Sequence, residues 1–156
     1  MKILQSLSSK KTQEVGERLA KNLIQKRSGV RNRQTSAVIA LQGELGAGKT
    51  TFVQGFLRGM GMKRHAQSPT FIIMRRHGLP KRPGGFKNIF HIDAYRLKNP
   101  DHMKALGFEA IVQDPQNVIL VEWPELLKKL LPRHTTWIML QHGAKENIRR
   151  IRIKKL

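Results

Sequence analysis

Residues 37–50 read AVIALQGELGAGKT. The segment from Gly43 to Thr50 matches G-x-x-x-x-G-K-[ST], the pattern of the phosphate-binding loop (P-loop) of nucleotide hydrolases. The apolar residues 37–41 predict a buried strand before the pattern, and residues 52–60 carry apolar side chains at helical spacing after it. Because a P-loop stands between a strand and a helix, we predict a nucleotide-binding site here.

The glycines of this segment have a physical role. Gly43, Gly46 and Gly48 lack a Cβ, so the loop can take left-handed turns and bring its backbone N–H groups against phosphate oxygens. The helix that follows adds its positive N-terminal end. Lys49 can then reach the β- and γ-phosphates, and the hydroxyl of Thr50 is placed to hold Mg²⁺. The predicted nucleotide-binding residues of the segment are Glu44, Leu45, Gly46, Ala47, Gly48, Lys49, Thr50 and Thr51.

A P-loop also needs an acidic group that orders Mg²⁺ and its water, usually at the end of a neighbouring buried strand. Asp93 ends the run 88–93, and Glu122 ends the apolar run 117–122. Both strand ends are expected near the mouth of the P-loop, where α/β sheets bind ligands, although either acid could be an ordinary residue of a turn. The predicted catalytic residues are Lys49, Asp93 and Glu122, and the predicted metal ligands are Thr50, Asp93 and Glu122.

Three further signals are weaker. In the tripeptide 68–70, Thr70 follows a rigid proline and could reach the γ-phosphate as in a switch loop, but taken alone the tripeptide is better explained as a turn. Trp123 could stack on the nucleotide or on a partner, and a buried core position fits it equally. His91 is better explained by packing or by a hydrogen bond to a site residue than by metal binding.

Predicted helices and strands alternate along the first two thirds of the chain. Helices are expected at 12–26 (capped by Ser9 or Thr12), after Lys49 as far as Gly59 or Gly61, from Asn99-Pro100 to Leu106, and at 125–130; strands are expected at 37–41, 71–74, 88–93, 117–121, 135–141 and 148–153, with a hairpin-like loop at 77–87. The last two strands form an antiparallel hairpin with one wet face. We therefore predict one domain over residues 1–156, a three-layer α/β P-loop NTPase-like sandwich whose mostly parallel sheet has an antiparallel edge.

The composition excludes several classes of protein. The absence of cysteine rules out disulfides, thiolate metal sites and cysteine catalysis. No apolar run reaches 18 residues, so no membrane span is expected, and the polar stretch after Leu4 is unlike the core of a signal peptide. These features fit a cytoplasmic protein of bacterial type.

Positive charge dominates the chain. Thirty Lys and Arg face ten Asp and Glu, which gives a net charge of +20. The excess is concentrated at 21–33, 75–87 and 145–155. Such a field attracts RNA, DNA or an acidic protein, unless the patches are only solvated surface.

Several motifs in order resemble one family, the bacterial TsaE (YjeE) ATPases of tRNA threonylcarbamoyladenosine biosynthesis. The matching segments are GELGAGKTT at 43–51, SPTF at 68–71, HIDAYRL at 91–97 and VEWPE at 121–125, and T-x-x-x-G-x-x-L-A at 12–20 resembles the family's opening helix. The order and spacing agree over roughly residues 9–140. The P-loop is generic, whereas the other motifs in this order are specific to the family.

The resemblance implies a small P-loop fold that binds ATP with Mg²⁺ and hydrolyses it slowly alone. It implies a partner, the TsaB–TsaD pair, which installs threonylcarbamoyl on the adenosine beside the anticodon, with tRNA contacted indirectly or through the basic patches. By position, it assigns Lys49 and Thr50 to phosphate and Mg²⁺, Thr70 to a switch-like segment, Asp93 and Glu122 to the metal or the attacking water, and Trp123 to the neighbourhood of the nucleotide.

The chain departs from the family pattern in its charge, in the longer insertion 78–87 and in the basic tail after Gly143. Two rival functions are therefore kept. One is a small P-loop kinase, with Arg75, Arg76 and Arg82 as lid arginines. The other is a basic RNA-binding protein whose P-loop only senses nucleotide.

Overall fold

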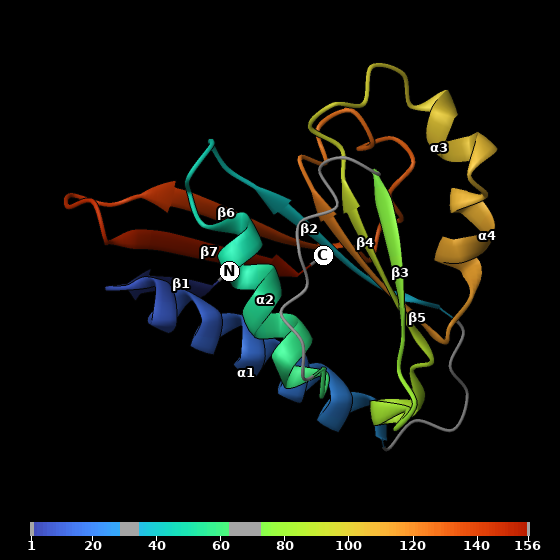
Figure 1. Ribbon diagram of the computed structural model, residues 1–156, viewed down its shortest axis with the longest axis horizontal. Helices are drawn as coiled ribbons and strands as arrows, with labels where there is room; N and C mark the ends of the chain where they lie inside the picture. The colour runs from blue at the N-terminus through green and yellow to red at the C-terminus, as the bar shows by residue number, and fades with distance from the viewer. Residues whose placement is uncertain (1, 29–34, 63–72, 156) are drawn as a thin grey trace.

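The structure is a computed structural model that describes residues 2–28, 35–62 and 73–155. Figure 1 shows its helices and strands in chain order. The strands are β1 (Lys2–Ser6), β2 (Ala37–Gln42), β3 (Met74–Gly78), β4 (Asn88–Asp93), β5 (Asn117–Glu122), β6 (Thr136–His142) and β7 (Arg149–Lys155). The helices are α1 (Ser9–Ser28), α2 (Lys49–Gly59), α3 (Asp101–Ala105) and α4 (Phe108–Gln113), and a 3-10 turn, η1, covers Pro83–Gly85.

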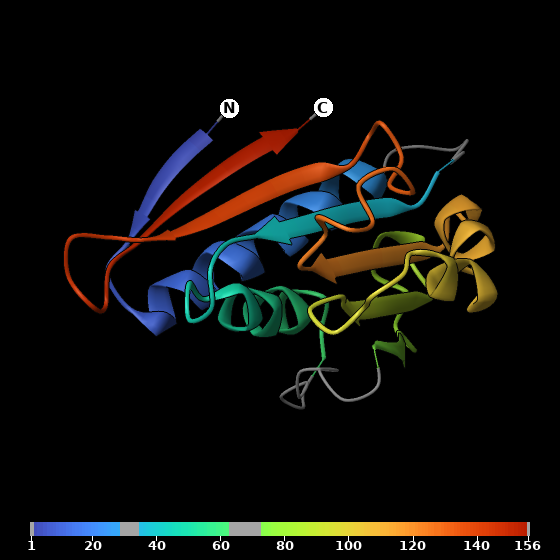
Figure 2. The same cartoon turned by 90° about the horizontal axis from the view of Figure 1, so that it is seen from above.

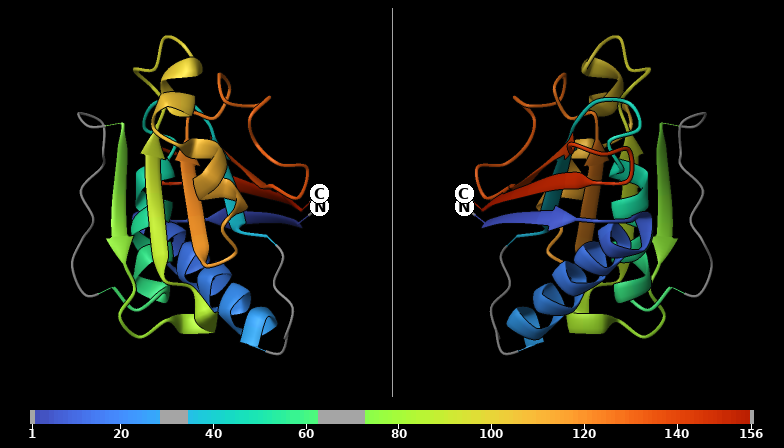
Figure 3. Two further views of the ribbon diagram at one scale, coloured as in Figure 1. Left: turned by 90° about the vertical axis from the view of Figure 1, so that its right-hand side faces the viewer. Right: turned by 90° about the vertical axis from the view of Figure 1, so that its left-hand side faces the viewer.

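All seven strands form one sheet in the order β1-β7-β6-β2-β5-β4-β3. The four central strands, β6, β2, β5 and β4, run parallel, whereas β3 and the pair β1–β7 are antiparallel to their neighbours. The predicted antiparallel edge is therefore present, and a second one lies at the opposite side of the sheet. Figures 2 and 3 show that β1 and β7 bring the two ends of the chain side by side.

Helices cover both faces of the central strands, which gives the predicted three layers. Figure 1 shows α1 and α2 on one side of the sheet and α3 and α4 on the other. Along β5 the buried side chains alternate between the two cores: Val118 and Leu120 pack with α1 and α2, while Ile119 and Val121 pack with α3 and α4. This alternation explains why the run 117–122 is buried at every position.

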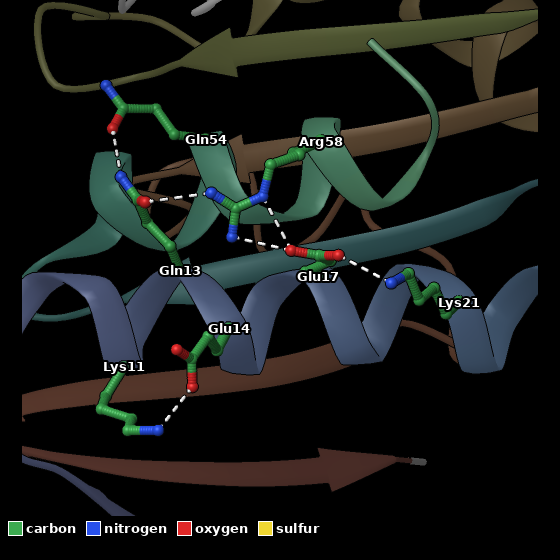
Figure 4. A network of polar contacts seen from close by, with 7 residues as sticks. All are labelled: Lys11, Gln13, Glu14, Glu17, Lys21, Gln54 and Arg58. Atoms are coloured by element: carbon green, nitrogen blue, oxygen red, sulfur yellow. Dashed lines mark hydrogen bonds and ion pairs between the residues drawn. The ribbon is translucent and has the colours of Figure 1, made fainter. Parts of the chain in front are cut away.

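The two helices of the first layer approach each other very closely. A Cβ placed on Gly55 would lie 2.0 Å from the backbone oxygen of Gln13, and one on Gly16 would lie 2.3 Å from that of Phe52. Figure 4 shows the polar contacts at the edge of this contact, where Arg58 of α2 binds Glu17 and Gln13 of α1. The glycines are therefore what allows α1 to lie against the helix that carries Lys49.

Most of the predicted elements are confirmed, three differ, and two observed elements were not predicted. The N-cap of α1 is Ser8, whose Oγ accepts a hydrogen bond from the N–H of Lys11, and not Ser9 or Thr12. Asn99 binds the N–H of Asp101 with its side chain, so α3 begins one residue later than predicted. The segment 125–130 forms successive turns and not a helix. β1 and α4 were not predicted.

The tripeptide 68–70 and residues 71 and 72 of the strand predicted at 71–74 lie outside the described residues. The strand itself, β3, begins at Met74 and ends at Gly78, so it lies later than predicted and takes in the start of the predicted loop 77–87. Within the described ranges, no helix combines the length and the apolar character needed to cross a bilayer.

Candidate nucleotide-binding site

The loop between β2 and α2 has the left-handed backbone that its glycines predict. The φ angles are +147° at Gly43, +74° at Gly46 and +97° at Gly48. At Gly43 a Cβ would also lie 2.3 Å from the backbone oxygen of Leu140, so both the conformation and the space require glycine. The backbone of β6 at Leu140 therefore packs directly against the start of the loop.

The helix α2 begins directly at Lys49, with Gly48 as its N-cap, and no side chain from the described ranges caps it. The first N–H groups of a helix have no partner within the helix, and they carry the positive end of its dipole. An uncapped helix of eleven residues that opens onto a glycine loop is the arrangement that binds phosphate groups in other proteins.

The amine of Lys49 lies inside the loop. Its Nζ donates hydrogen bonds to the carbonyl oxygens of Gly43 at 2.7 Å and Glu44 at 2.8 Å, and it stands 3.8 Å from the ring centre of Trp123. The side chain is buried, and this burial lowers the pKa of Lys49, while the carboxylates of Glu122 and Asp93 oppose the shift. A buried cation held by carbonyl dipoles and a π face can accept an anion.

Glu122 at the end of β5 is bound from two sides. The hydroxyl of Thr50 donates to its Oε2 at 3.0 Å, and the Nε2–H of His91 donates to its Oε1 at 2.9 Å. His91 and Glu122 are both buried, with 0% and 2% of their side chains exposed. His91 therefore fixes the orientation of the carboxylate, in agreement with the prediction that it hydrogen-bonds to a site residue.

Asp93 and Glu122 are direct neighbours, because they are register partners at the ends of the parallel strands β4 and β5. Asp93 is buried, and its Oδ1 accepts the N–H of Tyr95 at 3.1 Å, which closes a tight turn after the strand. The two acids predicted from separate strand ends thus lie next to each other at the carboxyl ends of the parallel strands, beside Thr50.

Trp123 is held in a strained backbone conformation. Its φ is +57°, which residues other than glycine rarely adopt, and its N–H donates to the carbonyl oxygen of Leu41 at 3.3 Å. The strain turns the indole out of the sheet and over Lys49, with the ring of Tyr95 4.9 Å away. Strain of this kind is found where a side chain must be aimed at a site.

A cleft of about 880 Å³ lies beside the start of the loop. Its walls include Gly43 and Glu44 of the loop, Tyr95 and Trp123 at the strand ends, and Met139 of β6. This volume lies in the upper part of the range of small-molecule sites. The exposed fractions of Tyr95 (56%) and Met139 (37%) show that the cleft has an apolar, accessible rim.

The oxygen atoms at the loop fit a magnesium ion that is shared with a nucleotide. Mg²⁺ prefers hard oxygen ligands, usually one or two carboxylates together with substrate phosphates, and the Thr50 hydroxyl with Glu122 and Asp93 offers these. Among the described residues, no group of three or more His, Asp and Glu could hold a metal on its own. The donor set therefore suits an ion that arrives with phosphate oxygens.

The sequence as a whole matches a known family. The family model described as "Threonylcarbamoyl adenosine biosynthesis protein TsaE" matches residues 6–151. The chain belongs to the TsaE family. The match covers every residue of the site described above.

Curated TsaE proteins agree with this assignment, and one solved structure has the same fold. Those named "tRNA threonylcarbamoyladenosine biosynthesis protein TsaE" are 36% identical in Bacillus subtilis (69% of this chain, 63% of that protein) and 38% identical in Rickettsia prowazekii (64% and 65%). A third, from Streptomyces coelicolor, is 41% identical over 72% of this chain and 66% of its own length. The matches thus span slightly less than two thirds of these relatives.

The crystal structure of B. subtilis YdiB superposes with a TM-score of 0.66 at 23% identity, over 99% of this chain and 84% of that one, and shares the P-loop NTPase-like fold.

The structure of this TsaE-family chain brings together Lys49, Thr50, Asp93, Glu122 and Trp123. Of the other predicted residues, Glu44, Leu45 and Gly46 lie exposed along the loop, Ala47 is buried beneath it, and Gly48 and Thr51 flank Lys49 and Thr50 at the start of α2. Thr70 lies outside the described residues.

Two residues at the loop were not predicted. Arg149 of β7 donates from Nη2 to the carbonyl oxygen of Gly46 at 3.1 Å, and the Nε2–H of His142 donates to that of Leu45 at 3.2 Å. Both contacts join residues about one hundred positions apart, so no local pattern in the sequence points to them. The only available signal was the unexplained basic tail, to which Arg149 belongs.

Proposed function

We propose that this chain is a Mg²⁺-dependent ATPase that supports the TsaB–TsaD pair in the threonylcarbamoyl modification of the tRNA adenosine next to the anticodon. The observation that carries the proposal is the arrangement of Lys49 and Thr50 against Glu122 in a chain of the TsaE family. We propose that hydrolysis is slow in the isolated chain and faster with its partners.

Lys49 and the start of α2 are assigned to the phosphates. The carbonyl oxygens of Gly43 and Glu44 now accept the hydrogen bonds of the Lys49 amine, and the β- and γ-phosphate oxygens of ATP would be stronger acceptors for the same cation. In a buried position this charge stabilises phosphate more than it would in water. Trp123, whose ring already covers the amine, would keep water from that side.

Thr50, Asp93 and Glu122 are the residues that would hold Mg²⁺, which neutralises charge on the phosphate oxygens when it is bound. His91 keeps the Glu122 carboxylate turned toward Thr50, and the turn at Tyr95 fixes Asp93 beside it. Two carboxylates so held can also orient a water molecule for attack on the γ-phosphate.

The apolar rim of the cleft supports the proposed dependence on a partner. Leu45, Tyr95, Leu126 and Met139 are among the exposed large apolar side chains, and all four lie on or around the cleft and the loop. A protein that covered them would exclude water from the site, and exclusion of water strengthens every electrostatic interaction within it. The TsaB–TsaD pair is the partner that we propose for this surface.

The test is ATP hydrolysis by the purified chain with and without the TsaB–TsaD pair. We expect phosphate to be released as the free ion, slowly alone and faster in the complex, and Lys49→Ala to remove both activities. Phosphate that appeared on a small-molecule acceptor would instead assign the chain to the kinases. Hydrolysis that was unchanged in Lys49→Ala would exclude the proposed site.

A further inference from the structure

A second groove, of about 500 Å³, lies on the face of β6 and β7 that points away from α1. Ile138, Leu140 and Ile151 of these strands belong to the core beneath α1 and α2. The alternate residues point to the opposite face, where the register pairs Trp137 with Lys154 and Met139 with Arg152. The segment 124–135, which links β5 to β6 and is the orange loop beside these strands in Figure 2, supplies the other wall.

The charged side chains of this groove are all positive. Its lining includes Lys128, Arg133, Arg152 and Lys154, and no acidic residue. Within the described part of the chain, none of these four residues makes an ion pair. Four cations around one groove repel each other, so the arrangement favours a bound polyanion.

Arg152, which lines the groove and is partly buried, has a donor atom that is not satisfied. Its Nε is buried and has no hydrogen-bond partner in the described structure. A buried donor without a partner is unfavourable, and structures rarely contain one. A phosphate oxygen in the groove is an acceptor of the right kind for a guanidinium group.

Trp137 adds an aromatic surface to the positive charge of the groove, and a base can stack on such a surface. Its indole is partly exposed and lies among the cations, between Lys154 on β7 and Ala40 on β2. Stacking of a base on an aromatic ring, next to cations that follow the backbone, is the common mode of single-strand binding. Arg150, Arg152 and Lys154 occupy every second position of β7, so their Cα atoms follow one another at roughly 7 Å along the strand.

We propose that this groove binds an unpaired segment of nucleic acid, with phosphates on Lys128, Arg133, Arg152 and Lys154 and one base stacked on Trp137. The site is separate from the P-loop, although Gln42 and Met139 line both cavities and make them neighbours. An acidic protein surface would match the charges but would leave the indole without a stacking partner. The proposal does not depend on ATP hydrolysis, so it is tested without nucleotide.

The experiment measures the fluorescence anisotropy of labelled oligonucleotides of about ten residues, a length within the range of known single-strand sites. Single-stranded RNA, DNA of the same sequence and the RNA duplex are titrated with the full chain. We expect either single strand to bind better than the duplex. RNA that bound more tightly than DNA would add recognition of the 2′-hydroxyl, and equal binding would indicate the backbone and the bases alone.

The test variant is Lys128→Ala/Arg133→Ala/Lys154→Ala, whose three sites are exposed. Its matched control, Lys10→Ala/Arg18→Ala/Lys98→Ala, removes the same charge from exposed positions outside the groove. The groove variant should bind at least tenfold more weakly. A plot of log K against log salt concentration should also be less steep for this variant, with a slope whose magnitude is smaller by about 2. The control should stay within about twofold of the parent. Equal losses in both variants would overturn the proposal.

Fluorescence of the two tryptophans tests the stacking separately. Trp123→Phe leaves Trp137 as the single indole, and we expect its emission to be quenched by RNA, because a base stacks on it. Trp137→Phe leaves Trp123, which should not respond. A response of Trp123 alone, or displacement of RNA by poly-glutamate at an equal concentration of charges, would show that the groove is not a single-strand site.

Discussion

Thr50 at the start of α2 donates its hydroxyl hydrogen to Glu122 at the end of β5, with 3.0 Å between Oγ1 and Oε2. The two residues come from different layers of the fold and lie 72 positions apart in the sequence. Because His91 occupies the other oxygen of the same carboxylate, Glu122 joins the P-loop helix to β4 as well as to its own strand. The carboxylate is therefore held in place by residues of two other elements.

We predict that Lys49→Ala reduces ATP binding or turnover by at least a factor of about one hundred. The change removes the buried cation that we propose faces the phosphates, and a buried charge stabilises an anion more strongly than an exposed one. Binding is measured by calorimetry and turnover by phosphate release in the complex. Lys98→Ala removes an exposed lysine and should behave like the parent. Parental binding and turnover in Lys49→Ala would disprove the assignment.

We predict that Asp93→Ala and Glu122→Ala both lose turnover in the complex, and that at least one of them still binds nucleotide. The two carboxylates should order Mg²⁺ and water more than they hold the base or sugar. Calorimetry with ATP separates binding from the hydrolysis rate. Asp101→Ala and Glu109→Ala replace exposed acids on α3 and α4 and serve as controls. An acid whose variant kept the parental rate would have no role in the chemistry.

Substitution of His91 tests whether the orientation of the Glu122 carboxylate matters for turnover. We expect His91→Phe to lower the free energy of unfolding by about 1–3 kcal/mol, because it leaves a buried carboxylate oxygen without its donor. The turnover number should fall while the affinity for ATP changes little. His91→Gln keeps a donor and should recover part of both losses, whereas His102→Phe, on the exposed surface, should cost little. Urea denaturation and phosphate release give the two readouts.

The close contact of α1 and α2 gives a prediction about stability. Gly55→Ala should destabilise the protein by about 1–3 kcal/mol or more, because the new Cβ would lie 2.0 Å from the backbone oxygen of Gln13. The higher helix propensity of alanine, about 1 kcal/mol, offsets only part of this. At Gly78, no atom of the described residues lies within 4 Å of the added Cβ, so Gly78→Ala should change stability by less than about 0.5 kcal/mol. Equal midpoints in urea for the two variants would contradict the packing argument.

The parts of the fold that could be predicted are those in which one local pattern decides the structure. The run 117–122 is apolar because both of its faces are buried, and the P-loop glycines are needed for their own backbone angles. The segment of β1 has no such pattern, because β1 is an edge strand and even its Ile3 side chain is 55% exposed. Its partner strand, β7, lies at the other end of the chain, so no local signal indicates the pairing. The turns at 125–130 mimic a helix in sequence because Leu127 and Leu130 face the core at helical spacing.

The candidate site shows the same division. Lys49, Thr50, Asp93 and Glu122 could be predicted because each has a fixed place in a strand–loop–helix pattern or at a strand end. Arg149 and His142 could not, because they reach the loop only through the order of strands in the sheet, in which β6 and β7 follow β2. The position of the Trp123 ring over Lys49 also depends on the positive φ of Trp123, which no residue pattern specifies.

The last prediction concerns the basic surface of the β3–β4 hairpin. Lys81 and Arg82 are exposed near its tip, and Lys87 lies where the chain returns to β4. We expect Lys81→Glu/Arg82→Glu/Lys87→Glu to weaken association with the TsaB–TsaD pair or its bound tRNA, and to leave the ATP affinity of the isolated chain nearly unchanged. Exposed charges act at long range and are screened over about 8–10 Å at ordinary salt, so the effect should appear mainly as slower association and should fade as salt rises. Surface plasmon resonance at several salt concentrations measures both rates, with Lys10→Glu/Arg18→Glu/Lys98→Glu as the variant of equal charge. Association equally tight in the hairpin variant at low and high salt would show that these charges are only solvated surface.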